Sequence, residues 1–143
     1  MRQDTEHRTN VRIYTAGYGS QKSIPKFAEF MERTGSLLVD VRFRPASRNP
    51  NWSRSWLQKR FGSEYLWLKA LGNVNYKNGG PIELLDPEAA LVILAPIIAT
   101  RPLLLLCACK DHRECHRTEA AKFLACRTGA KVWHLWQDQP SLF

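Results

Sequence analysis

The sequence predicts a single-domain α/β protein, a three-layer αβα sandwich around a mainly parallel five-stranded sheet. Three observations lead to this fold class. Strand-like and helix-like segments alternate along the chain, which is typical of parallel sheets with right-handed crossovers. The run "PLLLLCAC" over residues 102–109 is apolar throughout, as expected for a central strand buried on both faces. The length of 143 residues suits one domain.

Five segments have the composition of β-strands. They are short and rich in β-branched, aromatic or leucine side chains, and glycine, proline or polar residues bound them. The first, "VRIYTAG", stops at Gly17. The predicted strands cover residues 11–17, 37–42, 64–69, 102–109 and 131–136.

Four segments between these strands carry helix signals. Ser23 is placed to cap the first helix, and Gly35 is placed to end it. Asp86 and Pro87 open the third helix as N-cap and first helical residue, and Pro96 is expected to kink or split that helix. The predicted helices cover residues 23–35, 53–62, 86–100 and 113–129.

This order of elements predicts a Rossmann-like sheet with strand order 3-2-1-4-5, in which the first and fourth strands are adjacent. Folds of this type bind ligands beyond the carboxyl ends of the strands, where the strand order reverses. We expect one domain over residues 1–143, with a core over 11–136 and polar tails at 1–10 and 137–143.

The charge balance favours an anionic partner. Lysine and arginine total 21 against 13 acidic residues, so the formal net charge is +8. This excess favours a nucleotide or nucleic acid. No segment resembles a signal peptide, and the apolar stretch at 90–100 is too short to cross a membrane. We therefore expect a cytoplasmic protein with no membrane partner and reduced cysteines.

The turn after the first strand, "GYGS", begins like a dinucleotide-binding fingerprint. The match fails where Lys22 replaces the third glycine, so we expect no nicotinamide or flavin cofactor. Glycines also let a backbone approach an anion closely, which makes Gly17 and Tyr18 candidate ligand-binding residues. The alternative is a tight turn that needs glycine only for its backbone conformation.

The second strand leads into "DVRFRPASRNPNWSR". Side chains alternate along a strand, so Asp40, Arg42 and Arg44 are expected on one face. Arg48 and Trp52 follow on a loop, where they suit phosphate contact and base stacking. The alternative is a solvated basic loop whose Trp52 folds back onto the core.

The segment "CACKDHRECHR" after the fourth strand allows several interpretations. A metal site would need Cys109, His112, Cys115 and His116, but all four lie within eight residues, so we expect no metal. A reactive thiol at Cys109 or Cys107 would lie between a strand and a helix, where thiol pKa values fall. As an anion-binding turn, the segment would supply Lys110 and Arg117 to a phosphate and His116 to proton transfer. In the structural alternative, Arg117 pairs with Asp40.

These motifs together resemble the family known as domain of unknown function 488. The resemblance rests on Gly17-Tyr18-Gly19, "VDVRFRPASRNPNW", Leu71-Gly72 and "LLCACKDHRECHRTEAA", and it spans roughly residues 11 to 136. It implies a Rossmann-like domain with its motifs around one pocket, and its activity is unassigned. The family commonly has glutamate where this chain has Cys109.

The site therefore predicts binding of a nucleotide or nucleic-acid segment in a basic pocket at the strand ends. If the protein is an enzyme, hydrolysis or transfer at a glycosidic or phosphate bond is expected, with Asp40, His116 and Cys109 as catalytic residues. The alternatives are a non-catalytic nucleic-acid-binding module and a thiol-dependent enzyme.

Overall fold

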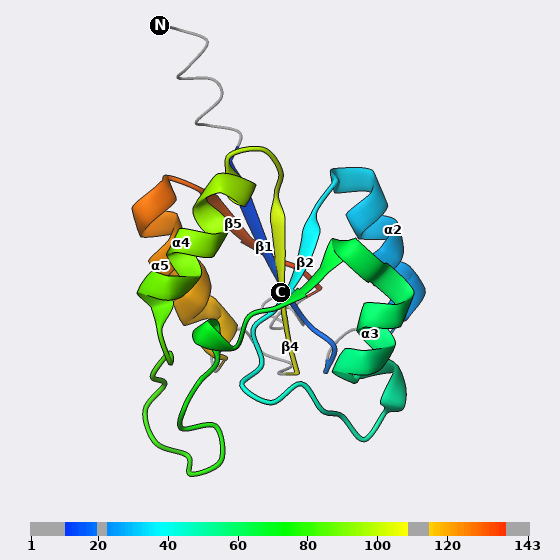
Figure 1. Cartoon of the computed structure of the whole chain (residues 1–143), viewed down its shortest axis with the longest axis horizontal. Coiled ribbons are helices and arrows are strands. Elements are labelled where there is room, and N and C mark those ends of the chain that lie inside the picture. Colours follow the sequence, from blue (N-terminus) through cyan, green and yellow to red (C-terminus); the bar gives the residue numbers. More distant parts are fainter. Residues whose placement is uncertain (1–10, 20–22, 109–114, 137–143) are drawn as a thin grey trace, which may run out of the picture.

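Five parallel strands form a single sheet in the order β3-β2-β4-β1-β5 (Figure 1). The structure is a computed structural model and describes residues 11–19, 23–108 and 115–136. The predicted α/β class with a parallel five-stranded sheet is confirmed. The strands are β1 (Arg12–Gly17), β2 (Leu37–Asp40), β3 (Tyr65–Trp67), β4 (Leu103–Cys107) and β5 (Lys131–His134).

The predicted strand order 3-2-1-4-5 is wrong, although β1 and β4 are adjacent as expected. Strand β4 lies between β2 and β1, with Leu105 opposite both Val39 and Thr15. All five residues of β4 are fully buried, whereas β5 alternates between exposed and half-buried residues. An all-apolar strand is best shielded in the middle of a sheet, and β4 takes that place.

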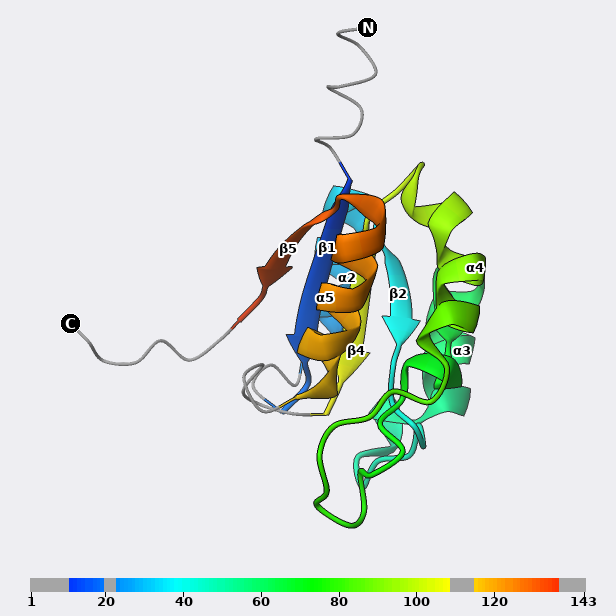
Figure 2. The same ribbon diagram turned by 90° about the vertical axis from the view of Figure 1, so that its left-hand side faces the viewer.

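Four helices cover the two faces of the sheet. Helices α2 (Ile24–Thr34) and α3 (Arg54–Phe61) lie on one face, and α4 (Pro87–Ile98) and α5 (His116–Thr128) lie on the other (Figures 1 and 2). The alternation along each strand sorts the core: Leu104 packs with α2 and α3, while Leu105 packs with α4 and α5. Short 3₁₀ helices span Pro50–Trp52, Gly62–Glu64 and Lys69–Leu71.

The helix boundaries follow the capping signals in the sequence. The Ser23 hydroxyl accepts a hydrogen bond from the Lys26 backbone N–H, and the Asp86 carboxylate accepts one from Ala89. Gly35 ends α2 with a φ of 74°, in the left-handed region that favours glycine. Helix α4 runs through Pro96 to Ile98, so the proline does not split it.

Helix α5 begins at His116 and not at residue 113. Cys115 is its N-cap, and the Cys115 Sγ accepts the Arg117 backbone N–H at 3.5 Å. The start of α5 therefore lies at the carboxyl ends of the strands, beside β4. Within the part of the chain that the structure describes, no helix is long and apolar enough to cross a membrane.

Candidate functional site

A pocket of about 420 Å³ lies beyond the carboxyl ends of β1, β2 and β4. Segments that are far apart in the sequence form its wall: the turn after β1, residues 42–46 after β2, the loop at 72–86, and the start of α5. Figure 2 shows these connections gathered at the ends toward which the strand arrows point. The lining residues are Tyr18, Arg42, Phe43, Arg44, Ala46, Asn73, Tyr76, Ile82, Ala108 and His116.

Arg42 and Asp40 form a buried bidentate pair at the floor of this site. Arg42 Nε donates to Asp40 Oδ1 at 2.8 Å, and Arg42 Nη2 donates to Oδ2 at 2.6 Å. The Arg42 backbone N–H also donates to Oδ1, at 3.2 Å. Asp40 is fully buried and Arg42 is 5% exposed. The carboxylate thus fixes the plane of the guanidinium, because two parallel hydrogen bonds allow one orientation.

Tyr65 completes this pair from the neighbouring strand. Its hydroxyl donates to Asp40 Oδ2 at 2.5 Å. Burial raises the pKa of Tyr65 well above its ordinary value, and the charge and hydrogen bond of Asp40 raise it further. Burial alone would lower the pKa of Arg42, but its bond to Asp40 and the carboxylate charge raise that pKa above its ordinary value. Tyr65 therefore stays neutral and Arg42 stays charged.

One nitrogen of the Arg42 guanidinium, Nη1, makes no hydrogen bond with Asp40. Nη1 has no hydrogen-bond partner among the described residues, although it is a buried charged donor. The Tyr18 ring covers the guanidinium, with 5.6 Å between Arg42 Cζ and the ring centroid. A buried donor without a partner is costly, so Nη1 is a candidate contact for a ligand.

His116 lines the pocket from the start of α5. Its Nε2 is 2.7 Å from the Val41 carbonyl oxygen, which can only accept a hydrogen bond. Nε2 must therefore carry the proton, and in the neutral ring Nδ1 is the basic nitrogen. The predicted role of His116 in proton transfer is compatible with this geometry, because the histidine lines the pocket.

The loop at residues 72–86 is held against the segment after β2 by a close backbone approach. A Cβ atom on Gly72 would lie 2.6 Å from Phe43 Cα and 2.9 Å from Phe43 N. Only a residue without a side chain allows this distance. The contact brings Tyr76 to Phe43, with 5.5 Å between the ring centroids. These two rings form an aromatic side of the pocket.

The predicted phosphate contact of Arg117 does not fit its placement. Arg117 is fully buried, and its Nε donates to Thr15 Oγ1 at 3.2 Å while Nη1 contacts Cys107 Sγ at 3.3 Å. The Thr15 hydroxyl in turn lies 2.6 Å from His134 Nδ1. Thr15 and Cys107 share the sheet face covered by α5, whereas Asp40 lies on the opposite face with Tyr65. That alternation also explains why Asp40 pairs with Arg42 and not with Arg117.

The predicted base stacking by Trp52 does not fit the structure either. Trp52 is fully buried, and the Tyr18 ring stacks on it at 4.8 Å with an interplanar angle of 9°. The aromatic core beneath α2 takes the ring, as the structural alternative expected. Arg44 and Arg48 are exposed, and Arg44 lines the pocket.

The remaining predicted residues differ in where they lie. Gly17 ends β1 beside Cys107, and the Tyr18 N–H donates to the Cys107 carbonyl, so both stand at the predicted edge. Cys109 and Lys110 lie outside the described residues. The other candidate thiol, Cys107, is fully buried.

A family comparison bears on the segment that supplies the Asp40–Arg42 pair and Gly72. Residues 23–78 match the family described as Domain of unknown function DUF488. This match supports the resemblance seen in the sequence over residues 23–78, and the matched segment contains Asp40, Arg42, Tyr65 and Gly72. Neither the curated proteins nor the solved structures gave a match.

Sequence reasoning missed three residues that the structure places at the site. Tyr65 and Trp67 lie in β3, and the Trp67 indole N–H donates to the Arg42 carbonyl at 2.9 Å. Tyr76 lies on the loop that Gly72 positions. The predicted strand order already placed β3 beside β2, and this pairing was the signal that could have brought Tyr65 near Asp40. In the structure Tyr65 is in register with Leu38, two residues before Asp40.

Proposed function

We propose that this protein binds a phosphate-bearing ligand, a nucleotide or a nucleic-acid segment, in the pocket between Arg42, Arg44 and His116. The observation that carries the proposal is the Arg42 guanidinium: Asp40 fixes it, it is buried, and Nη1 has no partner among the described residues. A preorganised guanidinium with a spare N–H group is suited to a phosphate oxygen.

The other lining residues offer the ligand positive charge and aromatic surface for stacking. Arg44 is exposed at the rim and can neutralise a second phosphate oxygen. Phe43 and Tyr76 supply aromatic surface for a base, the role that the sequence assigned to Trp52. Asp40 acts as a positioning residue, because its contacts are with Arg42 and Tyr65 inside the protein.

Access to Nη1 requires a local movement. Nη1 is buried, and the Tyr18 ring lies over the guanidinium. A phosphate therefore displaces this ring to reach Arg42. Tyr18 then contacts the ligand from the side, which keeps it among the ligand-binding residues.

Catalysis at this site is the second part of the proposal. His116 Nδ1 is the basic nitrogen of a ring held by Val41, so it can take a proton from a water or hydroxyl nucleophile. The reaction class that fits is hydrolysis or transfer at a glycosidic or phosphate bond. A binding module would show the same affinity without turnover, and a thiol enzyme would lose its activity on alkylation of Cys109 or Cys107.

The experiment is titration of the purified protein with nucleoside mono-, di- and triphosphates by calorimetry, with Arg42→Lys as the main variant. Lysine keeps a cation beside Asp40, which avoids stranding a buried carboxylate, but it lacks the planar fork. Loss of one charge-assisted hydrogen bond is worth about 1.5–3 kcal/mol, so the affinity should fall by about tenfold or more.

Arg127→Lys is the matched control, because Arg127 is exposed near the far end of α5 and pairs with Glu88. It should leave the affinity unchanged. Nucleotide binding that is equally tight in wild type and Arg42→Lys, in variants with native melting curves, would contradict the proposal. So would a wild-type protein that binds none of the nucleotides.

A further inference from the structure

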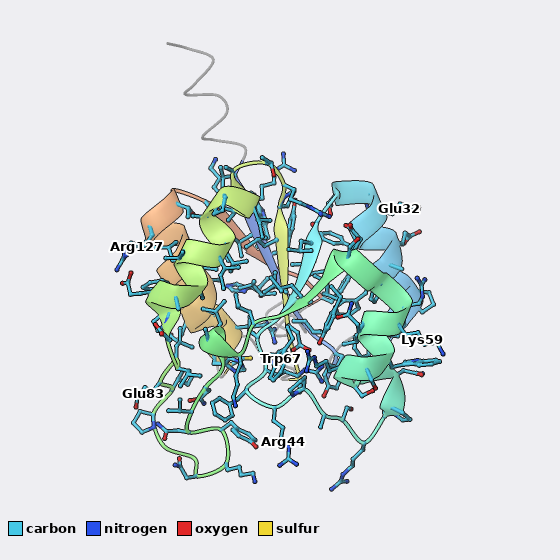
Figure 3. The ribbon with its side chains drawn as sticks, in the orientation of Figure 1. Glu32, Arg44, Lys59, Trp67, Glu83 and Arg127 are labelled. Atoms are coloured by element: carbon cyan, nitrogen blue, oxygen red, sulfur yellow. The ribbon has the colours of Figure 1, made fainter. Side chains whose placement is uncertain are left out.

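The segment that leaves the pocket is strongly basic over its whole length. Residues 41–63 contain six lysine and arginine residues and no aspartate or glutamate. All of these cations except Arg42 have exposed side chains. In Figure 3, Arg44 projects from the loop after β2 and Lys59 projects outward from α3. The six residues are Arg42, Arg44, Arg48, Arg54, Lys59 and Arg60.

Direct contacts join the pocket to α3. The Arg42 carbonyl accepts the Trp67 indole N–H at 2.9 Å, and Arg54 Cζ lies 4.5 Å from the centroid of the Trp67 ring. Arg54 is the first residue of α3. These contacts connect Arg42 to the start of α3, the helix that also carries Lys59 and Arg60.

A hollow with an exposed tryptophan lies on that helix. Trp56 is 46% exposed, and Lys59 Nζ stands 5.5 Å from its ring centroid. The hollow has a volume of about 450 Å³, and its lining combines one aromatic ring, two cations and no acid: Ile24, Asn51, Trp56, Lys59 and Arg60. An exposed ring beside cations is the arrangement that proteins use to stack an unpaired base and hold its phosphate.

We propose that the ligand is a single-stranded nucleic acid several nucleotides long, which runs from the pocket along residues 44–54 to a second base site at Trp56. This inference rests on the proposed function, since the pocket holds one end of the strand. Charge complementarity selects a polyanion, and the Trp56 hollow selects a strand with unpaired bases over a duplex. An acidic peptide would use the cations but gain little from the ring.

The test uses fluorescence anisotropy with labelled oligothymidylates of about two to sixteen nucleotides, and thymidine monophosphate as the ligand of the pocket alone. Affinity should rise with length and then level off. Trp56→Ala should weaken binding of the long strands by about tenfold, because one stacked base is lost. The double variant Lys59→Gln/Arg60→Gln should weaken it comparably. Neither change should alter the affinity for thymidine monophosphate.

Trp133→Ala is the matched control for Trp56. Trp133 is 44% exposed and lies on β5, at the edge of the sheet opposite β3. Its replacement removes an aromatic ring of similar fractional exposure and should leave every affinity unchanged. Native melting curves for the variants exclude unfolding as the cause of lost binding.

Three results would overturn the proposal. Long strands that bind no tighter than thymidine monophosphate would remove the second site but leave the pocket intact, because Arg42→Lys would still weaken the mononucleotide. Duplexes or polyglutamate that compete as well as single strands would assign the basic surface to a different partner. Failure of both the mononucleotide and the strands to bind would reject the proposed function as well.

Discussion

Two arginines are buried near the strand ends, and their surroundings give them different roles. Asp40 holds Arg42 through both carboxylate oxygens, in a wall that faces a pocket. Arg117 contacts Thr15 and Cys107 on the other face of the sheet, with no exposed area. The first arginine is oriented for a ligand, and the second ties α5 to β1 and β4.

The pair of Tyr65 and Asp40 predicts a pH dependence of stability. The pKa of Tyr65 is raised in the folded protein above its ordinary value of 10.0. Above pH 10.0 the unfolded chain loses the Tyr65 proton while the folded protein keeps it. The free energy of unfolding therefore falls as pH rises, by at most about 1.4 kcal/mol per pH unit. Below pH 10.0 Tyr65 is protonated in both states, and its full contribution to stability is present. Tyr65→Phe should be less stable than wild type at neutral pH, and this difference should shrink at alkaline pH.

Urea unfolding of both proteins at about pH 8 and about pH 11 measures the effect, since their difference cancels the titration of all other groups. A stability difference that is the same at both pH values would show that Tyr65 does not carry the raised pKa.

Replacement of Arg117 should lower the stability of the protein without weakening ligand binding. Arg117→Met keeps most of the side-chain volume but removes the donors to Thr15 and Cys107. The free energy of unfolding should fall by about 1–3 kcal/mol. Arg117→Ala should cost more, because it adds a cavity. Calorimetric titration of Arg117→Met with nucleotides should give the wild-type affinity; a weakening as large as that of Arg42→Lys would return Arg117 to the binding site.

At the scale of elements, the pocket depends on how closely the loop at 72–86 packs on the segment after β2. Gly72→Ala would place a Cβ atom 2.6 Å from Phe43 Cα, and a backbone atom cannot rotate away as a side chain can. We expect the loop to shift outward, with a loss of about 1–3 kcal/mol in stability and weaker nucleotide binding.

Gly80→Ala in the same loop is the control. Its Cβ atom would come nearest to a side-chain oxygen, Asn78 Oδ1 at 3.0 Å, which can adjust. Melting curves and nucleotide titrations of the two variants give the comparison. Equal binding by both would show that the position of this loop does not matter to the pocket.

Local signals predicted the elements well, and long-range pairing explains what they missed. Capping residues such as Ser23 and Asp86 act within one turn, so the sequence located those helix starts directly. Strand order depends on contacts between distant segments, and the sequence showed that β4 is apolar without showing which strands flank it. The side chains at 40 and 42 were assigned to one face by alternation, but the burial of Trp52 depends on Tyr18 and Phe27, which belong to other elements.

At the scale of the whole molecule, the two buried arginines lie on opposite faces of the sheet, and the pocket at the strand ends takes residues from both sides. The face covered by α2 and α3 carries the Asp40–Arg42 pair, and the acid-free segment 41–63 continues from it. The face covered by α4 and α5 carries the buried contacts of Arg117. The net charge of +8 is therefore less informative than its placement, because a ligand responds to the cations that it touches.

This placement predicts which cations set the salt dependence of nucleic-acid binding. Each phosphate contact with a single strand contributes about 0.7 to the slope of log affinity against log salt concentration. Arg44→Gln/Arg48→Gln removes two cations beside the pocket and should lower the magnitude of the slope by about 1.4. Lys122→Gln/Lys131→Gln also lowers the net charge by two, but at positions on α5 and β5 that do not line the pocket, and should leave the slope unchanged. Anisotropy titrations of both double variants with an oligothymidylate over a range of potassium chloride concentrations measure the two slopes. Equal reductions in the two variants would mean that the strand responds to the overall charge of the protein and not to the surface that begins at Arg42.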